Sequence, residues 1–392
     1  MTIDALTGLR GAKPAIARQL CALFLFVAPS AWAAGPSHYT IIDLGTFGGY
    51  GSRANDINNA GQVVGCAALP ASGFPPQFDG PSRAFLYSDG VMTNLGVLKN
   101  DFQYDESSCA DAINDLGQIT GHSKVTFGEH AFLYSNGVMT DMGTLGGIFS
   151  RPMDINNAGQ VAGRATREDG SYRAFLYSGG MMTDIGTPEG FRTRAVAINN
   201  SGQVAGDGWC CVGTYLPHAF LYQNNLFTDL GTLGGSTSQV SDINEAGQIV
   251  GYSDLPADSV QHPFLYDNGV MTDLSSLIGD NRRVERITNT GMMLVGEIVP
   301  SGQRAQSFLY KNDVLTNLKA LLPPDSGWYA LDGRAINESG QIVGQGIINN
   351  QLPAFFPQSS HAFLMTPVPV STCAPDGAQA SGSIYRICMP SP

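Results

Sequence analysis

The chain has 392 residues, a formal net charge of -12, 48 glycines and only 14% charged residues. Such an acidic chain repels nucleic-acid phosphates and anionic membrane surfaces, so neither is an expected partner. The length alone would favour two or three domains, but an internal repeat argues for a single one.

The first 33 residues have the features of a secretory signal peptide. Arg10, Lys13 and Arg18 make a basic start, residues 20–27 form an apolar core, and residues 31–33 match an A-x-A cleavage site. We therefore expect export to the periplasm or the cell exterior. No later segment has 18 uninterrupted apolar residues, so no membrane anchor is expected.

A unit of about 44 residues recurs seven times and carries three anchors. The first is an IN..GQ.VG run, whose isoleucines are Ile57, Ile113, Ile155, Ile198, Ile243, Ile287 and Ile336. The second is AFLY, whose phenylalanines are Phe85, Phe132, Phe175, Phe220, Phe264, Phe308 and Phe363. The third is VMTDLG, with its acid or amide at Asp43, Asn94, Asp141, Asp184, Asp229, Asp273 and Asn317. This period is typical of a β-propeller.

Residues 151–190 show how one unit is expected to fold. The runs RPMDIN, QVAG, RAFLYS and MMTDIG each predict a short strand. NNAG and GG lie between them and supply residues that tolerate the positive φ of a tight hairpin. Four such antiparallel strands make one propeller blade, and stacking against neighbouring blades buries its faces.

The order of the anchors at the two ends predicts how the fold closes. Residues 39–44 provide a fourth strand with no blade before it, and residues 361–365 a third strand with no blade after it. Pairing the two completes a seventh blade and leaves no open sheet edge. We predict an all-β fold, a seven-bladed β-propeller of four-stranded antiparallel blades over residues 34–366, followed by a Pro- and Cys-containing tail at 367–392.

The strings HAFLY, DLGTLGG and DINNAGQVVG resemble those of the bacterial HAF-repeat family, a group of probable extracellular repeat proteins. The resemblance covers residues 39–365 and implies export and a repeat-built β fold. It implies no activity and no catalytic residues. Many relatives end in a sorting tail with an apolar helix, which the sequence at 366–392 does not match.

Residues that recur in every unit are interpreted as scaffold. His130, His218, His262 and His361 all stand two residues before the Phe anchor, and the third-anchor Asp is expected to cap a turn. DINNAG resembles half of a calcium loop, but its Asp56, Asp154 and Asp242 are replaced in other units by Ala112, Ala197, Arg286 and Ala335. No catalytic residue, metal site or cofactor is therefore predicted.

The cysteines left after removal of the signal segment are even in number, as expected of disulfides in an exported protein. Cys373 and Cys388 are expected to pair within the tail, and Cys66 and Cys109 to bridge neighbouring blades. The partners of Cys210 and Cys211 stay open.

Loop length departs from the repeat in four places. The interval from the third anchor to the next Ile grows from 14 to 19 residues at Asn94–Ile113 and Asn317–Ile336, and the second-strand Gly to Phe interval grows to 20 at Gly65–Phe85 and 19 at Gly344–Phe363. Antiparallel parity places these loops on one face, beside the predicted closure. Their candidate ligand-binding residues are Phe74, Phe78, Phe102, Tyr104, Asp105, Glu106, Trp328, Tyr329, Asp332, Phe355 and Phe356.

These residues favour a secreted binding module for an extracellular polysaccharide or a surface protein, because aromatic rings beside carboxylates suit sugar rings. The alternative is a glycosidase or polysaccharide lyase on the same face, with Asp105 or Glu106 facing Asp332. A purely structural exoprotein, whose long loops only cover the closure, is a third hypothesis. The oligomeric state is left open.

Overall fold

The computed structural model describes residues 39–70, 81–99, 106–186, 192–208, 216–256, 261–298, 304–348 and 360–369. The chain divides into two compact units, residues 1–36 and 37–392. Residues 1–33, the expected signal segment, lie outside the described residues, as do Cys210, Cys211, Cys373 and Cys388. Everything that follows concerns residues 37–392.

The described part is almost entirely β-structure, in five four-stranded sheets and one eight-stranded sheet, all built from antiparallel neighbours except at one residue pair. Three of the four-stranded sheets take their strands in the order β2(Ser52–Ile57)-β3(Val63–Ala68)-β4(Ser82–Ser88)-β5(Val91–Gly96), β14(Thr193–Ile198)-β15(Val204–Gly208)-β16(His218–Gln223)-β17(Leu226–Asp229) and β18(Ser238–Ile243)-β19(Ile249–Asp254)-β20(Gln261–Asp267)-β21(Val270–Asp273). A fourth is β22(Arg282–Ile287)-β23(Met293–Ile298)-β24(Arg304–Lys311)-β25(Val314–Asn317).

The eight-stranded sheet consists of two further four-stranded units, joined by a single parallel pair between Phe149 and Glu129. Their strands are β6(Ser108–Ile113), β7(Ile119–Val125), β8(Gly128–Ser135) and β9(Val138–Asp141), then β10(Gly146–Ile155), β11(Val161–Arg167), β12(Tyr172–Ser178) and β13(Met181–Asp184). Residues 151–190 therefore contain the four predicted strands. A short helix, α1(Ser275–Ile278), and a 3₁₀ turn, η1(Leu318–Leu321), lie in two of the connections.

The fifth four-stranded sheet joins the two ends of the described chain. Its order is β1(Tyr39–Gly45)-β28(Ser360–Pro367)-β27(Ile342–Ile348)-β26(Trp328–Ile336), and β1 and β28 are antiparallel from Tyr39 opposite Pro367 to Gly45 opposite Ala362. This is the strand pairing expected between residues 39–44 and 361–365. The first strand of each unit is called the inner strand below: β2, β6, β10, β14, β18, β22 and β26.

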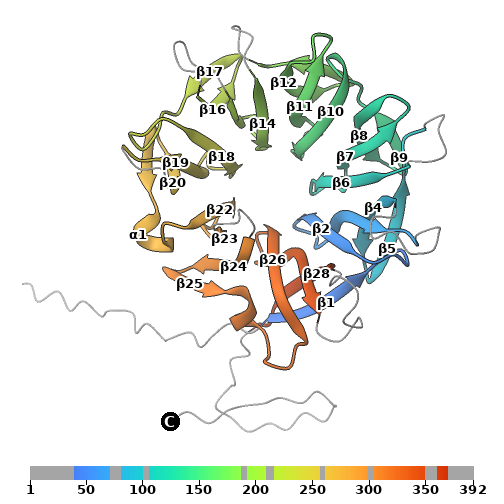
Figure 1. Ribbon diagram of the computed structural model, residues 1–392, viewed down its shortest axis with the longest axis vertical. Helices are drawn as coiled ribbons and strands as arrows, with labels where there is room; N and C mark the ends of the chain where they lie inside the picture. Colours follow the sequence, from blue (N-terminus) through green and yellow to red (C-terminus); the bar gives the residue numbers. More distant parts are fainter. Residues whose placement is uncertain are drawn as a thin grey trace, which may run out of the picture. The chain divides into compact units, whose positions relative to one another are not determined.

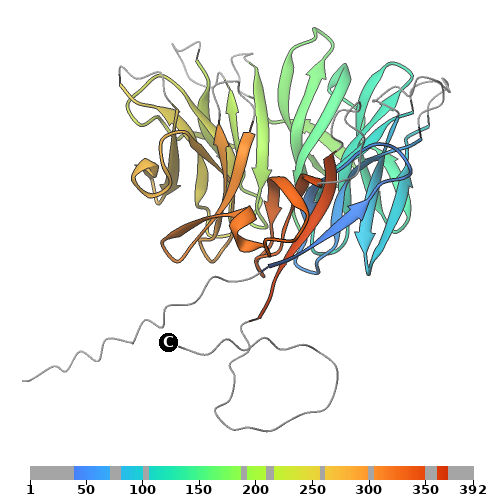
Figure 2. The same cartoon turned by 60° about the horizontal axis from the view of Figure 1, so that its bottom comes forward.

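The inner strands lie nearest a common centre, and the other strands lie further out (Figure 1). Each inner strand contacts the inner strands before and after it, and β2 contacts β26 as well as β6. The strands run between two rims (Figure 2). Because neighbouring strands are antiparallel, one rim holds the two hairpins of each unit and the other holds the connections that leave its second and fourth strands. We call these the hairpin rim and the connection rim.

The core lies between the sheets. Within the described residues, each buried hydrophobic cluster draws its members from two neighbouring four-stranded units. One of them places Ile57 and Phe85 against Val343 and Leu364, so the β2–β5 sheet packs on the sheet that contains both chain ends. Single twisted sheets bury little area by themselves, and this stacking supplies the hydrophobic stabilisation.

A glycine opposite the Phe anchor in six of the seven units makes this packing possible. A Cβ added at Gly121 would meet the Phe132 ring at 2.5 Å, and one at Gly163 would meet the Phe175 ring at 2.8 Å. In the β22–β25 sheet, Val295 takes the corresponding place opposite Val284. The spacing from Ile287 to the next glycine, Gly296, is nine residues instead of eight, and the register shows that Val295 replaces the glycine without an inserted residue. Phe308 instead lies 4.3 Å from the guanidinium carbon of Arg282.

Positive φ was expected in both hairpin turns of a unit. The turn between the third and fourth strands has it at both central residues, whereas the NNAG turn between the first and second strands has it only at the glycine. Asp89 and Gly90, at φ 53° and 82°, have the paired positive φ of a two-residue hairpin turn. In the NNAG turn, Gly61 takes positive φ and Asn58 does not. Asn58 instead accepts hydrogen bonds from the Ala60 and Gln62 backbone N–H groups at 3.1 and 2.9 Å.

The same asparagine also connects one unit to the next. Asn58 Nδ2 donates to the Asn114 carbonyl at 3.0 Å, and the equivalent contacts run from Asn114 to Asn156, from Asn156 to Asn199, from Asn199 to Asn244 and from Asn244 to Thr288. Asn337 Nδ2 donates back to the Asn58 carbonyl at 3.0 Å. Each of these carbonyls also accepts the N–H of the glycine three residues later, as Asn114 does from Gly117 at 3.0 Å, so the asparagine amide adds a second hydrogen bond that links neighbouring units at the hairpin rim.

Candidate functional site

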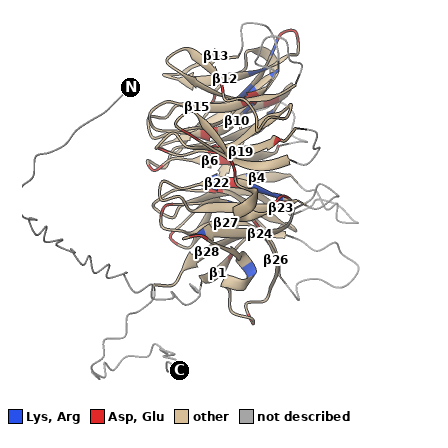
Figure 3. Cartoon of the chain, turned by 90° about the vertical axis from the view of Figure 1, so that its left-hand side faces the viewer, with Lys and Arg blue, Asp and Glu red and all other residues tan. Residues whose placement is uncertain are grey.

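The centre of the inner strands contains a pocket of about 330 Å³. Its lining is unusual for this chain, because six of its residues are arginines although the whole sequence has 21 lysines and arginines and a net charge of -12. Figure 3 shows how sparse charged residues are along the strands. The lining residues are Arg53, Asn55, Asp111, Arg151, Pro152, Met153, Arg164, Arg194, Glu285, Arg286 and Arg334.

Two positions of the inner strand supply most of this lining. The fourth residue before the Ile anchor is Arg53, Cys109, Arg151, Arg194, Gln239, Arg283 or Asp332, and the second is Asn55, Asp111, Met153, Val196, Ser241, Glu285 or Arg334. Alternate residues of a strand share one face, so both positions face the centre.

Every inner strand also has a register shift just before its Ile anchor, as between Ala54 and Asp56 or between Val284 and Arg286. Such a bulge redirects a side chain. It lets adjacent residues, Glu285 and Arg286, both reach the pocket.

The pocket arginines at the connection-rim end keep contact with solvent. Each inner strand begins at the connection rim. The fourth residue before the Ile anchor therefore lies closer to the connection rim than the Ile anchor does. The side chains of Arg151, Arg194 and Arg334 are 38, 35 and 30% exposed. A solute that enters the pocket from this rim can therefore reach their guanidinium groups.

Acidic and aromatic side chains hold these arginines in place. Arg194 Nε donates to Asp207 at 2.9 Å, Arg334 lies 3.3 Å from Asp332, and Arg151 lies 3.6 Å from Asp111. The Arg164 guanidinium lies 5.3 Å from the centre of the Tyr172 ring. Arginines anchored in this way lose little further conformational freedom when they bind an anion.

The surroundings of Arg53 and Arg194 shift the pKa values of these two arginines in opposite directions. Burial lowers the pKa of Arg53, and nearby Arg151 lowers it further, although Asp111 and Asp332 oppose both effects. Burial also acts against the charge of Arg194, but Asp207 outweighs it and raises the pKa of Arg194. Arg53 is thus a crowded cation, which a bound anion would stabilise.

The hairpin-rim end of the inner strands contains a second charge cluster, which shares Arg286 with the pocket. Asp56, Asp154 and Asp242 surround Arg286, which interacts electrostatically with all three and has a raised pKa. Burial raises the pKa of Asp56 to about 7 and that of Asp242 to about 6, against the opposing effect of Arg286. Each carboxylate also accepts the backbone N–H of the next unit's Ile, as Asp56 does from Ile113 at 2.9 Å. The three aspartates of the DINNAG runs thus meet an arginine.

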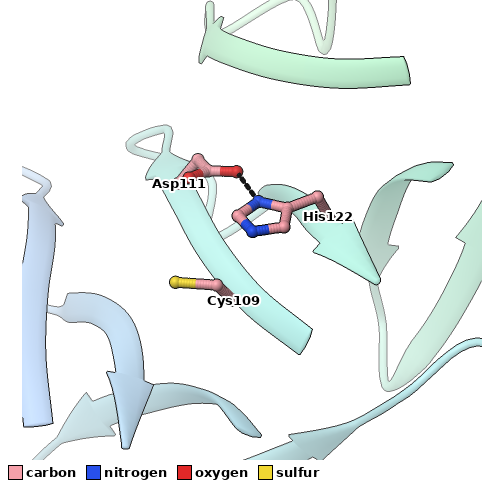
Figure 4. Close-up of side chains that lie close together, drawn as sticks. All are labelled: Cys109, Asp111 and His122. Carbon is pink, nitrogen blue, oxygen red and sulfur yellow. Dashed lines mark hydrogen bonds and ion pairs between the residues drawn. The ribbon is translucent and has the colours of Figure 1, made fainter. Parts of the chain in front are cut away.

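The predicted disulfide between Cys66 and Cys109 is confirmed. It connects β3 of the β2–β5 sheet to the inner strand β6 of the next unit, beside the pocket residues Arg53 and Asn55. Arg53 Nη2 lies 3.4 Å from both sulfur atoms, and Asn55 Nδ2 lies 3.3 Å from the Cys109 sulfur. His122 stands opposite Cys109 in the register of β6 and β7, and its Nδ1 lies 2.6 Å from Asp111. Cys109, Asp111 and His122 come together as shown in Figure 4.

The long-loop candidates are only partly within the described residues. Phe74, Phe78, Phe102, Tyr104, Asp105, Phe355 and Phe356 lie outside them. Glu106 accepts a hydrogen bond from Arg83 at 3.0 Å. Trp328 is 5% exposed and packs on Phe363 with the ring centres 5.8 Å apart, while Tyr329 is 58% exposed. Leu318, Leu321 and Leu322 of the same long connection are also buried in the core.

Asp332 is the one described member of that set that belongs to the centre, where Gln345 donates to it at 3.2 Å. Loop length does not predict the pocket, because the residues that line it lie on strands and not in the lengthened connections. An alignment of the units would have revealed the fourth position before the Ile anchor, where four of the seven residues are arginines.

The four anchor histidines have the scaffold role that was expected. Their Nδ1 atoms lie against the third-anchor aspartates: His130 with Asp141 at 2.9 Å, His218 with Asp229 at 3.1 Å, His262 with Asp273 at 3.1 Å and His361 with Asp43 at 2.8 Å. The aspartates in turn accept the backbone N–H two residues later, as Asp141 does from Gly143 at 2.7 Å.

No protein-family model and no curated protein matches the chain. Among solved structures it is similar to the β-propeller domain of the Trilobed protease from Pyrococcus furiosus, at 7% identity and a TM-score of 0.51, over 80% of this chain and 95% of that one. It is also similar to YCF48 bound to D1 peptide, at 10% identity and a TM-score of 0.48, over 88% and 98% of the two chains.

TolB from Acinetobacter baumannii is similar at 16% identity and a TM-score of 0.38, over 66% of this chain and 63% of TolB, so the chain matches less than two thirds of TolB's length. The likeness to the Trilobed protease domain identifies the fold as β-propeller-like and indicates nothing about activity.

Proposed function

We propose that the protein is an exported seven-bladed β-propeller that binds an anionic ligand in its central arginine-lined pocket. The blade number is supported by seven sequence units and by the packing of each four-stranded unit on the next. Closure of the ring is supported by the pairing of β1 with β28 and by the hydrogen bond from Asn337 to Asn58. The recurrent strings support membership of the HAF-repeat family.

The single observation that carries the binding function is the gathering of six arginines in one pocket of an acidic chain. Cations that merely kept the protein soluble would be spread over the surface. Burying several like charges side by side opposes folding, as the lowered pKa of Arg53 illustrates. A ligand with complementary charge relieves this repulsion and is bound tightly for the same reason.

The class of ligand follows from the guanidinium hydrogen-bond donors of the pocket and from its volume. Guanidinium groups match carboxylate, phosphate and sulfate oxygens, to which they donate two parallel hydrogen bonds. A volume of about 330 Å³ is at the lower end of the usual range for small-ligand pockets and admits one or two sugar rings. We favour an acidic unit of an extracellular polysaccharide, and a free oxyanion such as phosphate shares the same recognition chemistry.

The hydrolase or lyase alternative has less support. It requires two carboxyl groups that face one another across a substrate. Of the carboxylates considered for this role, Glu106 is engaged by Arg83 and Asp332 by Arg334 and Gln345. A binding module needs no such pair, and fixed arginines are sufficient for it.

Export is part of the proposal. The basic, apolar and A-x-A segments of residues 1–33 support it, and so does the Cys66–Cys109 disulfide, which is favoured outside the cytoplasm. No helix in the described ranges is long and apolar enough to span a membrane.

Calorimetric titration with acidic oligosaccharides tests the binding function. We expect oligogalacturonate to bind the full chain, and the double variant R151Q/R164Q to bind it at least tenfold more weakly, because two cations of the pocket are lost. The matched control is R167Q, which removes a cation from the same strand as Arg164, where it is paired with Asp184 outside the pocket. Its affinity should stay within twofold of the parent chain.

A second titration with inorganic phosphate separates a saccharide site from a free-oxyanion site. Preference for the oligosaccharide supports the polysaccharide assignment, and preference for phosphate replaces it with a small-anion receptor. Equal affinities of R151Q/R164Q and R167Q for every anion would overturn the assignment of this pocket.

A further inference from the structure

The Cys66–Cys109 disulfide lies among groups that a structural crosslink does not require. His122 and Asp111 stand beside it with side chains 13 and 14% exposed, and one ligand atom from each of Cys109, Asp111 and His122 lies within 4.8 Å of the others. Figure 4 shows Nδ1 of the His122 ring joined to the Asp111 carboxylate, with the Cys109 sulfur beside the ring. We propose that Cys66, Cys109 and His122 form a zinc site that exists only when the disulfide is reduced.

The histidine is already oriented for a metal. Asp111 accepts a hydrogen bond from Nδ1 at 2.6 Å, which leaves Nε2 as the lone-pair nitrogen. A carboxylate that holds the far nitrogen of a ligating imidazole is the common arrangement in zinc proteins. Asp111 in turn lies 3.6 Å from Arg151, so its position is fixed from both sides.

The four anchor histidines form a useful contrast. They are also paired with aspartates, but their partners are the turn-capping residues of the outer strands, as in His218 with Asp229. The described residues contain one group of three or more potential ligands, and it is the group at His122. His122 therefore differs from the repeated histidines in having sulfur within reach.

The donor set selects the metal. Two thiolates and one imidazole suit Zn²⁺, whereas Ca²⁺ and Mg²⁺ prefer oxygen. Two thiolates balance the charge of Zn²⁺, and Arg53 and Asn55 already direct N–H groups at the sulfur atoms. Three protein ligands leave one tetrahedral position for water or for a carboxylate oxygen.

Formation of the site requires a two-electron reductant, for which a dithiol suffices. Its thiolate attacks one sulfur of the Cys66–Cys109 bond, the mixed disulfide is resolved by the second thiol, and the dithiol leaves as a disulfide. Its two protons end on Cys66 and Cys109. Zinc binding then displaces these protons to the solvent. Reoxidation by a small-molecule disulfide, which leaves as two thiols after thiol–disulfide exchange, re-forms the Cys66–Cys109 bond and expels the metal, because a disulfide sulfur is a poor ligand.

Zinc titration of the full chain, with and without prior reduction by a dithiol that is then removed, tests the proposal. Co²⁺ serves as a spectroscopic substitute, since thiolate ligation gives it strong charge-transfer bands. We expect the reduced chain to bind one more zinc ion than the reduced C66S/C109S variant, a comparison that cancels any metal held by Cys210, Cys211, Cys373 or Cys388. The oxidised chain should lack this ion.

Two further variants keep the test decisive if C66S/C109S fails to fold. H122A retains the disulfide and should lose at least tenfold in zinc affinity after reduction, and D111N should lose about tenfold to a hundredfold. H218A removes a paired histidine elsewhere and should behave as the parent chain. Equal zinc binding by the reduced parent, H122A and C66S/C109S would overturn the proposal, as would zinc binding unchanged by oxidation.

Discussion

The two ends of the inner strands differ in how similar the residues at equivalent positions of the seven units are. At the hairpin rim, six of the seven units place an asparagine after the Ile anchor, and each donates to the unit that follows. Toward the connection rim, the fourth residue before the same Ile is arginine, cysteine, glutamine or aspartate. The hairpin-rim end thus keeps the same residue type in most units, whereas the connection-rim end changes it from unit to unit although the backbone is the same.

This difference separates scaffold from site more sharply than loop length does. A position that hydrogen-bonds the same backbone groups in every unit keeps asparagine in six of the seven units, since most replacements lose these hydrogen bonds. A position that faces the centre is free of this demand and can meet the needs of a single ligand. The charge clusters follow the same division, because Arg286 neutralises the aspartates at the hairpin rim while Arg53 and Arg151 at the other end crowd one another.

The strongest test of the neutralised end is R286A. Alanine occupies the same position in three other units, as Ala112, Ala197 and Ala335, so the backbone accepts it. The loss of the cation leaves Asp56, Asp154 and Asp242 facing one another, and removing one partner of an enclosed ion pair typically costs about 3–5 kcal/mol. We expect a decrease of this size in the free energy of unfolding at pH 8, measured by urea denaturation.

The loss caused by R286A should be smaller at pH 5, which lies below the pKa of about 7 of Asp56 and of about 6 of Asp242, so that these two carboxyls are protonated and no longer repel. K311A, which removes an exposed cation from the same sheet, is the control and should change the stability by less than about 0.5 kcal/mol. If R286A costs no more than K311A at pH 8, Arg286 does not hold the aspartates together.

The repeated asparagines should be the next most sensitive feature. Asn156 is 3% exposed, donates to Asn199 at 3.1 Å and accepts from the Gln160 backbone N–H at 3.0 Å. N156A removes both hydrogen bonds and takes the side-chain acceptor away from the Gln160 N–H, while the Asn199 carbonyl keeps the Gly202 N–H at 3.0 Å, so we expect a loss of about 1–3 kcal/mol by urea denaturation. N156T should cost less, because Thr288 occupies this position in the sixth unit and accepts from Met292 N–H at 3.0 Å. Equal losses for the two variants would contradict the role of the hydrogen bonds.

The raised pKa of Asp56 leads to a prediction about how the free energy of unfolding depends on pH. Its folded pKa of about 7 lies above the ordinary 3.8, so between these values the folded state holds a proton that the unfolded state has released. Stability should therefore fall as the pH rises from about 4 to about 7. One pKa unit corresponds to about 1.4 kcal/mol.

D56N removes this titration and keeps an oxygen to accept the Ile113 N–H. We expect it to flatten the stability profile and to be more stable than the parent chain at pH 8 by about 1–4 kcal/mol, because the folded pKa of about 7, which already includes the attraction to Arg286, means that ionising this buried carboxyl costs stability. Urea denaturation from pH 4 to pH 8 measures this. An unchanged slope would show that Asp56 is ionised throughout.

Much of the fold was predictable because its information is local and repeated. The strands within residues 151–190, the Asp–Gly turns and the pairing of residues 39–44 with 361–365 all follow from short patterns that occur in several copies. The register of the β22–β25 sheet was not predictable from spacing alone, since Val295 fills the place of a glycine without an insertion. The turn role of Asn58 was also only half predicted, because its contact to Asn114 belongs to the stacking of units.

The site was less accessible from the sequence. The Cys66–Cys109 bridge was predicted because cysteine chemistry is specific, whereas Arg53, Arg151 and Arg194 lie on different strands, 43 to 141 residues apart, and converge only when the sheets are arranged around a centre. Trp328 shows the opposite difficulty. An aromatic residue in a long connection suggests a ligand, but its burial against Phe363 depends on the packing of η1 and β26.

The smallest effect is expected where the repeat is most regular and most exposed. His130 pairs with Asp141 at 2.9 Å, and although burial raises the pKa of this carboxyl, the hydrogen bonds from His130 and Gly143 lower it below the ordinary value. A lowered carboxyl pKa stabilises the fold above the ordinary pKa, and the contribution disappears as the pH falls through the folded value. H130A should cost less than about 1 kcal/mol at pH 7, as exposed pairs do, and should raise the pKa of Asp141, measured by NMR titration. It should leave anion and zinc binding unchanged, because this pair belongs to the outer scaffold; a loss of either would mean that the outer histidines also belong to the site and that repetition is no guide to it.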